Sequence, residues 1–390
     1  MIGVQNSKIC ILYTLICALS PILVEYSFTY SSFTVLDTLI VLFYIISLPR
    51  LLMSGGPKVN VFFLWLFLFV VFHASVDYLT NSDTKILLRA MHLANYIFFL
   101  AFYNRLFFNS ELAIRIVRVV AIFSTIFLLF QHLAYAVVGI PIPGQLPIFL
   151  VNDEYALGGV VEMDLIRFSS IFLEPSQYGM YLLCALVLEL FYRKRPNNLV
   201  ILLFCLGAVV STSNTALAGM VLLLMLYVRK IGISVKMIAL AIVALFVIFV
   251  LAGTFVDAIL IRVGDGSSFG NRFNGYSQIK DLLSANPIWG IGFWSTEDMG
   301  DDYLPGWARL YVYFGIIGVL FYAVVYLLLY RSISNKIIFF LALFFNFGGD
   351  SFFSVYLLFY SCFFLLKKDC IKKKTYRDSI TLNTDASSVL

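Results

Sequence analysis

Apolar runs about as long as a bilayer is thick recur along almost the whole of this 390-residue chain. With 61% hydrophobic and only 13% charged residues, the chain has far more apolar surface than one water-soluble core can bury. Helices satisfy their own backbone hydrogen bonds in lipid, and these runs are too long and too uniformly apolar to be strands of a barrel. The sequence therefore predicts an all-α polytopic membrane protein with about 12 transmembrane helices.

Polar breaks separate the apolar runs and set the boundaries of the expected spans. The pair on either side of 211–215 is short for two crossings, and so is the last pair, which only 348–350 separates. The first run leads into Glu25 without a small-residue cleavage site, so we interpret it as a helix and not as a signal peptide. The expected spans lie near 9–24, 33–49, 59–76, 86–103, 116–138, 169–192, 198–212, 214–228, 236–254, 308–330, 336–348 and 351–366.

The distribution of Lys and Arg favours this topology, because these residues concentrate in short loops on the cytoplasmic side of a membrane. The net charge of +5 therefore indicates orientation, not nucleic-acid binding. With the N-terminus inside, both termini are cytoplasmic, 1–366 forms one transmembrane domain and 367–390 forms a basic cytoplasmic tail. Of the 27 basic residues, only these seven lie in or toward the outer side: Lys85, Arg89, Arg167, Arg262, Arg272, Lys280 and Arg309.

Two outer loops, 139–168 and 255–307, are much longer than the other connections. Long loops in compact proteins often carry function, because short turns suffice to join helices. Guanidinium groups bind phosphate through two parallel hydrogen bonds, so several of them at the outer surface suit a lipid-linked diphosphate. Pairing with acids of the same loops, or contact with lipid headgroups, stays open as the alternative. The basic residues within or beside these loops are Arg167, Arg262, Arg272, Lys280 and Arg309.

Glu174 lies within an apolar run and is followed by Pro175, a residue that starts or kinks helices. A carboxylate in the outer third of a membrane is costly and often functional. A raised pKa would suit a general base or a group that binds a hydroxyl. A structural ion pair with Arg167, seven residues earlier, is the alternative.

The sequence predicts neither a metal site nor another cofactor. The six cysteines form no C-x-x-C pair, so neither zinc nor a disulfide framework is indicated. The second long loop holds an acidic group without a neighbouring histidine, which is typical of a solvated loop. This group consists of Glu297, Asp298, Asp301 and Asp302.

Two segments resemble elements of bacterial O-antigen and exopolysaccharide polymerases of the Wzy type. Residues 167–176 read Arg-Phe-Ser-Ser-Ile-Phe-Leu-Glu-Pro-Ser and resemble the R-x-x-x-x-F-x-E-P-S element of that family. Arg272, followed by Asn-Pro-Ile-Trp-Gly-Ile-Gly at 286–292, is similar to the family's arginine and N-P-hydrophobic-x-G-x-G element in the large outer loop. The hydropathy plan of the whole chain is similar too.

The resemblance implies a glycosyltransferase that joins undecaprenyl-diphosphate-linked oligosaccharide repeat units at the periplasmic face of the bacterial inner membrane, during lipopolysaccharide biosynthesis. Our mechanistic hypothesis makes Arg167, Glu174 and Arg272 catalytic: the arginines stabilise the leaving diphosphate and Glu174 orients or deprotonates the acceptor hydroxyl. Arg262, Arg309 and Lys280 are the expected substrate-binding residues. The expected partners are the lipid-linked oligosaccharide, membrane lipids and a chain-length regulator protein.

Two other functions fit the same plan of helices and loops. An O-antigen ligase is expected to carry a histidine in the large outer loop, and 255–307 contains none. A flippase or transporter for lipid-linked sugars predicts ionisable residues along a pathway at the membrane midplane and two repeated halves. This chain has only scattered ionisable residues in its expected spans and no clear internal repeat, so the polymerase is favoured.

Overall fold

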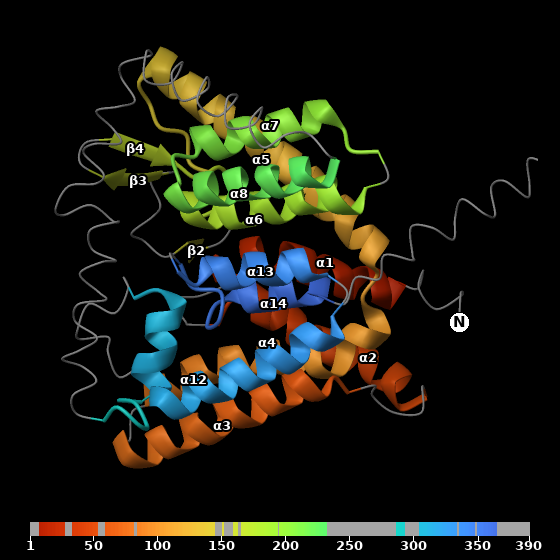
Figure 1. The fold of residues 1–390 in the computed structure, drawn as a ribbon, viewed down its shortest axis with the longest axis vertical. Coiled ribbons are helices and arrows are strands. Elements are labelled where there is room, and N and C mark those ends of the chain that lie inside the picture. The colour runs from red at the N-terminus through yellow and green to blue at the C-terminus, as the bar shows by residue number, and fades with distance from the viewer. Residues whose placement is uncertain are drawn as a thin grey trace, which may run out of the picture.

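The computed structural model describes residues 8–27, 33–53, 59–81, 84–144, 150–151, 159–162, 165–193, 195–231, 286–292, 304–333, 335–347 and 349–364. Within these ranges the chain forms eleven α-helices, one π-helical turn and four short strands. Most helices run parallel or antiparallel to one another in a single bundle (Figure 1). The all-α fold class expected from the sequence is confirmed.

Each helix overlaps one of the spans expected from the apolar runs, and the span expected at 236–254 lies outside the described residues. Helix α6 continues into a π-helical turn, η2 (Leu188–Tyr192). In chain order the helices are α1 (Lys8–Leu23), α2 (Val35–Met53), α3 (Val61–Asn81), α4 (Thr84–Phe107), α5 (Ser110–Val138), α6 (Pro175–Val187), α7 (Asn198–Val210), α8 (Asn214–Ile231), α12 (Gly306–Ser332), α13 (Lys336–Phe345) and α14 (Val355–Phe364).

Four of these helices, α2, α3, α5 and α12, are long and apolar enough to cross a membrane. They indicate a multi-pass membrane protein. Large apolar side chains also cover the outside of the bundle, among them Ile45, Leu52 and Phe123. Contiguous exposed apolar surface is unfavourable in water but matches the hydrocarbon of a bilayer. The apolar helices α1, α7, α13 and α14 are shorter, at 10–17 residues.

Buried tyrosines join the helices of the core through their hydroxyl groups. Tyr13 of α1 donates to the carbonyl oxygen of Phe99 in α4 (3.4 Å), and Tyr181 of α6 donates to that of Ala18 in α1 (3.1 Å). An aromatic ring fills the apolar interior while its hydroxyl needs a partner away from water. These bonds therefore fix the positions of α1, α4 and α6 along the bundle relative to one another.

A buried carboxylate joins three segments at one end of the bundle. Glu189 in η2 is only 2% exposed, and it pairs with Arg118 of α5 (3.0 Å) and Arg193 (2.9 Å). It also accepts a hydrogen bond from the N–H of Asn197 (2.9 Å), whose own side chain caps α7. A buried charge of this kind is tolerated only when it is paired and hydrogen-bonded.

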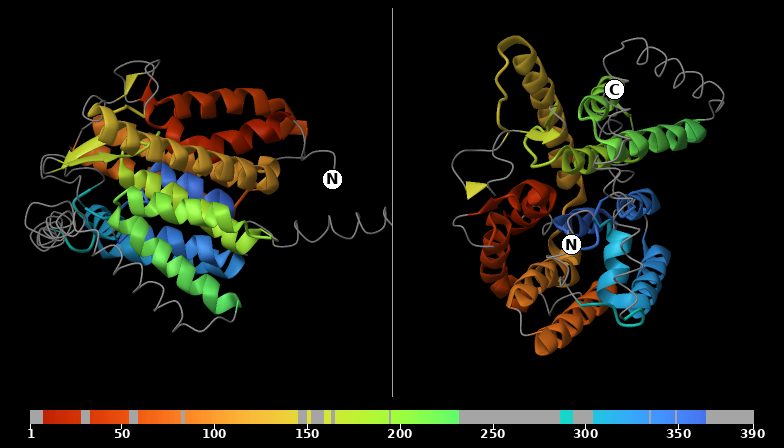
Figure 2. Two further views of the ribbon diagram at one scale, coloured as in Figure 1. Left: turned by 90° about the horizontal axis from the view of Figure 1, so that it is seen from above. Right: turned by 90° about the vertical axis from the view of Figure 1, so that its left-hand side faces the viewer.

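The opposite end of the bundle carries the four strands and the first turns of α6 and α12; we call it the strand end (Figures 1 and 2). Strand β1 (Tyr26–Ser27) pairs with β2 (Leu150–Val151). Strand β3 (Gly159–Glu162) pairs with β4 (Leu165–Phe168) in an antiparallel hairpin. The sequence did not predict these strands. They bring parts of the loop expected at 139–168 onto the bundle.

Candidate functional site

The segment that leads into α6 is fixed to α5 by hydrogen bonds. Ser170 has a positive φ of 61°, which is unusual for a residue with a side chain. Its N–H donates to Oε1 of Gln131 (3.0 Å), and its hydroxyl donates to the carbonyl oxygen of Ser124 (2.6 Å). Phe172 is fully buried two residues further on. The backbone between Arg167 and Glu174 is therefore held in one conformation by its surroundings.

Arg167, in β4, contacts the turn between α7 and α8. Its Nε donates to the hydroxyl of Thr212 (3.4 Å) and its Nη2 donates to the carbonyl oxygen of the same residue (3.3 Å). Thr212 lies two residues beyond Val210, the last residue of α7, where carbonyl groups lack helical partners and favour a nearby cation. This environment fixes a half-buried guanidinium group at the strand end.

Glu174 occupies the N-cap position of α6, and Pro175 is the first residue of the helix. Its carboxylate does not cap the helix; Oε2 accepts a hydrogen bond from the hydroxyl of Ser176 (2.8 Å). Proline suits this position because its missing N–H would have no helical partner there. Among the contacts between described residues, no ion pair joins Glu174 to Arg167. The structural pairing that the sequence left open is therefore not observed.

A second carboxyl group, from Glu25, lies beside Glu174. Glu25 follows α1 and is 6% exposed, and its Oε1 accepts a hydrogen bond from the N–H of Leu173 (3.0 Å). Burial raises the pKa of Glu25 well above its usual range; the Leu173 N–H opposes this shift and the carboxylate of Glu174 adds to it. Tyr356 of α14 interacts electrostatically with both carboxyl groups, and its hydroxyl donates to the carbonyl oxygen of Gln177 (2.8 Å).

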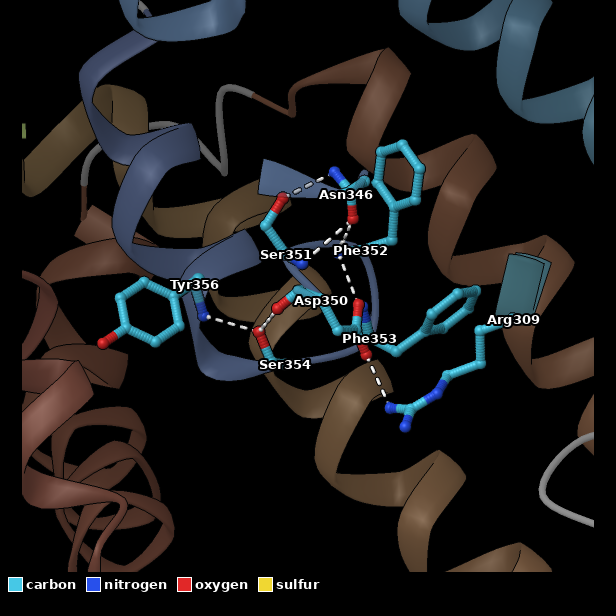
Figure 3. Close-up of polar contacts among 8 residues, drawn as sticks. All are labelled: Arg309, Asn346, Asp350, Ser351, Phe352, Phe353, Ser354 and Tyr356. Atoms are coloured by element: carbon cyan, nitrogen blue, oxygen red, sulfur yellow. Dashed lines mark hydrogen bonds and ion pairs between the residues drawn. The ribbon is translucent and has the colours of Figure 1, made fainter. Parts of the chain in front are cut away.

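Arg309, in the first turn of α12, pairs with Asp350 in the turn between α13 and α14 (Figure 3). The distance from Nη1 to Oδ2 is 2.9 Å. The other carboxylate oxygen of Asp350 accepts hydrogen bonds from the N–H groups of Phe352 and Phe353, both at 3.0 Å. One aspartate thus orders the turn before α14 and positions the guanidinium group of α12.

Asn346 organises the same turn from within (Figure 3). Its Oδ1 accepts from the N–H groups of Ser351 (3.0 Å) and Phe352 (3.1 Å), and its Nδ2 donates to the hydroxyl of Ser351 (2.7 Å). The start of α12 is bound to this turn, since the Gly306 N–H donates to the carbonyl oxygen of Gly349 (2.8 Å). A Cβ on Gly306 would overlap the Asn346 side chain, so the close approach requires glycine.

Residues 286–292 insert into a break in α12. Gly315 has φ 59° and ψ −160°, and the helix bends sharply there (Figure 1). In an unbroken helix the N–H groups of Ile316 and Ile317 would bond to the carbonyl oxygens four residues earlier. Here they donate to the carbonyl oxygens of residues 287 and 288, at 3.1 and 3.3 Å.

The two carbonyl oxygens released by the break are also satisfied by the inserted segment. Val312 accepts from the N–H of Ile291 (2.9 Å) and Tyr313 accepts from that of Gly292 (3.3 Å). Four backbone groups that the break would leave unpaired thus find partners in one short segment, as a non-helical backbone inside a membrane protein requires. The break also orients the first part of α12, which carries Arg309.

Three of the six site residues predicted from the sequence lie at the strand end: Arg167, Glu174 and Arg309. Arg262, Arg272 and Lys280 lie outside the described residues. The structure adds Glu25, Asp350 and Tyr356 to the residues of the candidate site. In the sequence, Glu25 and Asp350 lie at the edges of expected spans and Tyr356 lies within one. Among the described residues, no group of three or more His, Cys, Asp or Glu side chains is placed to hold a metal ion.

Comparisons with protein-family models, with curated proteins and with solved structures find no match to this chain.

Proposed function

We propose that this protein is an O-antigen polymerase that joins undecaprenyl-diphosphate-linked oligosaccharide repeat units at the periplasmic face of the bacterial inner membrane. The observation that carries the proposal is that both segments resembling Wzy-type elements, 167–176 and 286–292, lie at the same end of the bundle (Figure 1). The first holds Arg167 and Glu174. The second orients the half of α12 that carries Arg309.

The proposed reaction breaks the bond between the anomeric carbon of the growing chain and the phosphate oxygen of its lipid carrier. The acceptor hydroxyl of the next lipid-linked unit forms the new glycosidic bond and loses its proton. Glu174 accepts that proton, and Arg167 and Arg309 stabilise the negative charge of the departing diphosphate. Arg262, Arg272 and Lys280 complete the proposed phosphate-binding group.

We further propose twelve spans, with the strand end on the periplasmic side and both termini in the cytoplasm. The support is the position of the basic residues, since Arg50, Arg105, Arg193 and Arg331 lie at helix ends remote from the strand end. The expected tail at 367–390 then lies on the cytoplasmic side.

Thiol labelling tests this orientation. Ile288→Cys at the strand end and Arg115→Cys near the start of α5 introduce thiols at side chains that are 61% and 72% exposed. A membrane-impermeant maleimide should label Ile288→Cys in intact spheroplasts and Arg115→Cys only after permeabilisation. Labelling with the reverse order would overturn the orientation.

A deletion strain tests the reaction itself. We expect its lipopolysaccharide core to bear a single repeat unit, because one unit can still be ligated without polymerisation. A core with no repeat unit would instead indicate a ligase or a flippase. Complementation with Arg167→Ala or Glu174→Ala should leave the single-unit phenotype at a normal protein level, whereas Glu111→Ala, at the opposite end of the bundle, should restore long chains. Long chains with Glu174→Ala would remove that residue from the mechanism.

A further inference from the structure

Glu25 is an enclosed carboxyl group at the strand end, with only 6% of its surface exposed. It follows the last turn of α1, and its side chain reaches the backbone that precedes α6, 148 residues later in the chain. Oε1 accepts the Leu173 N–H, while Oε2 is buried and has no hydrogen-bond partner among the described residues. An ionised carboxylate with a buried, unpartnered oxygen is costly, whereas a protonated carboxyl group avoids most of that cost.

The surroundings of Glu25 contain no compensating charge among the described residues. The ionisable groups that interact with it are Glu174, in the segment before α6, and Tyr356, in α14. No arginine, lysine or histidine of the described chain forms an ion pair with it. Two neighbouring carboxyl groups that have no cation beside them in the described part of the chain do not both ionise readily.

The exposure of the two side chains assigns the charge within this pair. Glu174 is half-buried and accepts the hydroxyl hydrogen of Ser176, which stabilises a carboxylate. It also lies at the N-terminal end of α6, where the helix dipole favours negative charge. Glu25 lacks that solvent exposure, and its buried Oε2 has no hydrogen-bond partner among the described residues.

We propose that Glu25 is a positioning residue for Glu174: it remains protonated at neutral pH, holds the Leu173–Glu174 backbone, and leaves Glu174 as the single ionised member of a carboxyl pair. This inference rests on the proposed function for its consequence, because the ionised Glu174 is the group that accepts the proton of the acceptor hydroxyl. The acceptor proton passes to Glu174, and Glu25 keeps its own proton throughout.

Infrared difference spectroscopy tests the charge assignment without any activity measurement. The full-length protein in lipid nanodiscs is titrated from neutral to alkaline pH, and the C=O stretch of protonated carboxyl groups is followed. The wild type should lose one such band as the pH rises. Glu25→Gln should lack this band from the start, and Glu174→Gln should retain it. A band that is unchanged in Glu25→Gln, or absent only from Glu174→Gln, would overturn the inference.

Two substitutions separate the positioning role from a merely structural one. Glu25→Gln keeps an oxygen that can accept the Leu173 N–H, so polymerisation by the purified protein at neutral pH should stay within about twofold of the wild type. Its activity should also extend to higher pH, because the wild type loses activity as Glu25 ionises beside Glu174. Glu25→Ala removes the acceptor and should lower the rate about tenfold or more by releasing the backbone that carries Glu174.

These outcomes are distinguishable from a failure of the proposed function. The positioning role would be overturned if polymerisation activity fell with rising pH identically in the wild type and Glu25→Gln. It would also be overturned if Glu25→Ala polymerised at the wild-type rate. Chains of normal length in the deletion strain would overturn the polymerase assignment, and the infrared band would still decide which carboxyl group holds the proton.

Discussion

Replacing Gly315 with alanine should destabilise the protein through the junction between α12 and residues 286–292. The conformation at Gly315, with φ 59° and ψ −160°, is open almost only to glycine. An added Cβ would lie 2.3 Å from the carbonyl oxygen of Ile288 and 2.7 Å from the nitrogen of Gly290. Both are backbone atoms, so the overlap cannot be relieved by a change of side-chain rotamer.

The magnitude follows from two contributions. A residue with a side chain forced into such a backbone region costs about 1–3 kcal/mol. Moving 286–288 away from the break would also sacrifice the hydrogen bonds donated by Ile316 and Ile317, at about 1 kcal/mol net each. We therefore expect Gly315→Ala to reduce the free energy of unfolding by about 3–5 kcal/mol, which is large for one substitution.

Gly139→Ala provides the matched control. Gly139 ends α5 with φ 73°, but an added Cβ would meet no atom within 4 Å. That variant suffers the backbone strain without the collision and should lose only about 1 kcal/mol. Equilibrium unfolding of both purified variants in mixed micelles, with increasing denaturing detergent, measures the difference. Equal losses in the two variants would refute the reasoning, because the inserted segment would then contribute nothing.

Three further predictions concern other parts of the bundle. Glu189→Ala leaves Arg118 and Arg193 without their shared buried partner and should reduce the free energy of unfolding by about 3–5 kcal/mol in the same unfolding assay; a loss below 1 kcal/mol would contradict it. Asn346→Ala removes three side-chain hydrogen bonds to the turn before α14 and one to the carbonyl oxygen of Ala342 in α13, and should cost about 2–4 kcal/mol, as measured by the same detergent titration against a wild-type control. For Glu25, a pKa raised by burial means that its contribution to stability is fully present below the ordinary carboxyl pKa of 4.5 and is lost as the pH rises from there through the raised pKa of the folded state; Glu25→Gln should therefore become progressively more stable relative to the wild type from about pH 4.5 upward, and a constant difference across pH would disprove this.

The helical architecture could be predicted from the sequence because it depends on a local property. Each span is set by the length of one apolar run and by the polar residues that end it, so 198–212 agrees closely with Asn198–Val210. The start of α6 could not be predicted in this way. The apolar run begins at 169, but the helix begins at Pro175 because 170–173 bonds instead to Gln131 and Glu25, which are distant in sequence.

The candidate site was predictable only where a motif placed its residues. Glu174 and Arg167 are identifiable in the sequence as charged residues beside an apolar run, and the structure places both at the strand end. In the sequence, Asp350 belongs only to a short polar break between two expected spans. Its ion pair depends on α12 and the α13–α14 turn meeting in space, and a single sequence carries no signal for such a contact.

The three described site residues lie on two segments, 167–176 and the first half of α12, and hydrogen bonds hold each segment to several parts of the bundle. The segment of Glu174 is bonded to α5 and to Glu25, and the first half of α12 is bonded to residues 286–292 and to the α13–α14 turn. Arg167 contacts the α7–α8 turn. Charges that are oriented before a substrate arrives need little reorganisation as negative charge develops. The proposed polymerisation of two flexible lipid-linked chains would gain from such rigidity, because the protein then contributes fixed geometry and only the substrates have to be ordered.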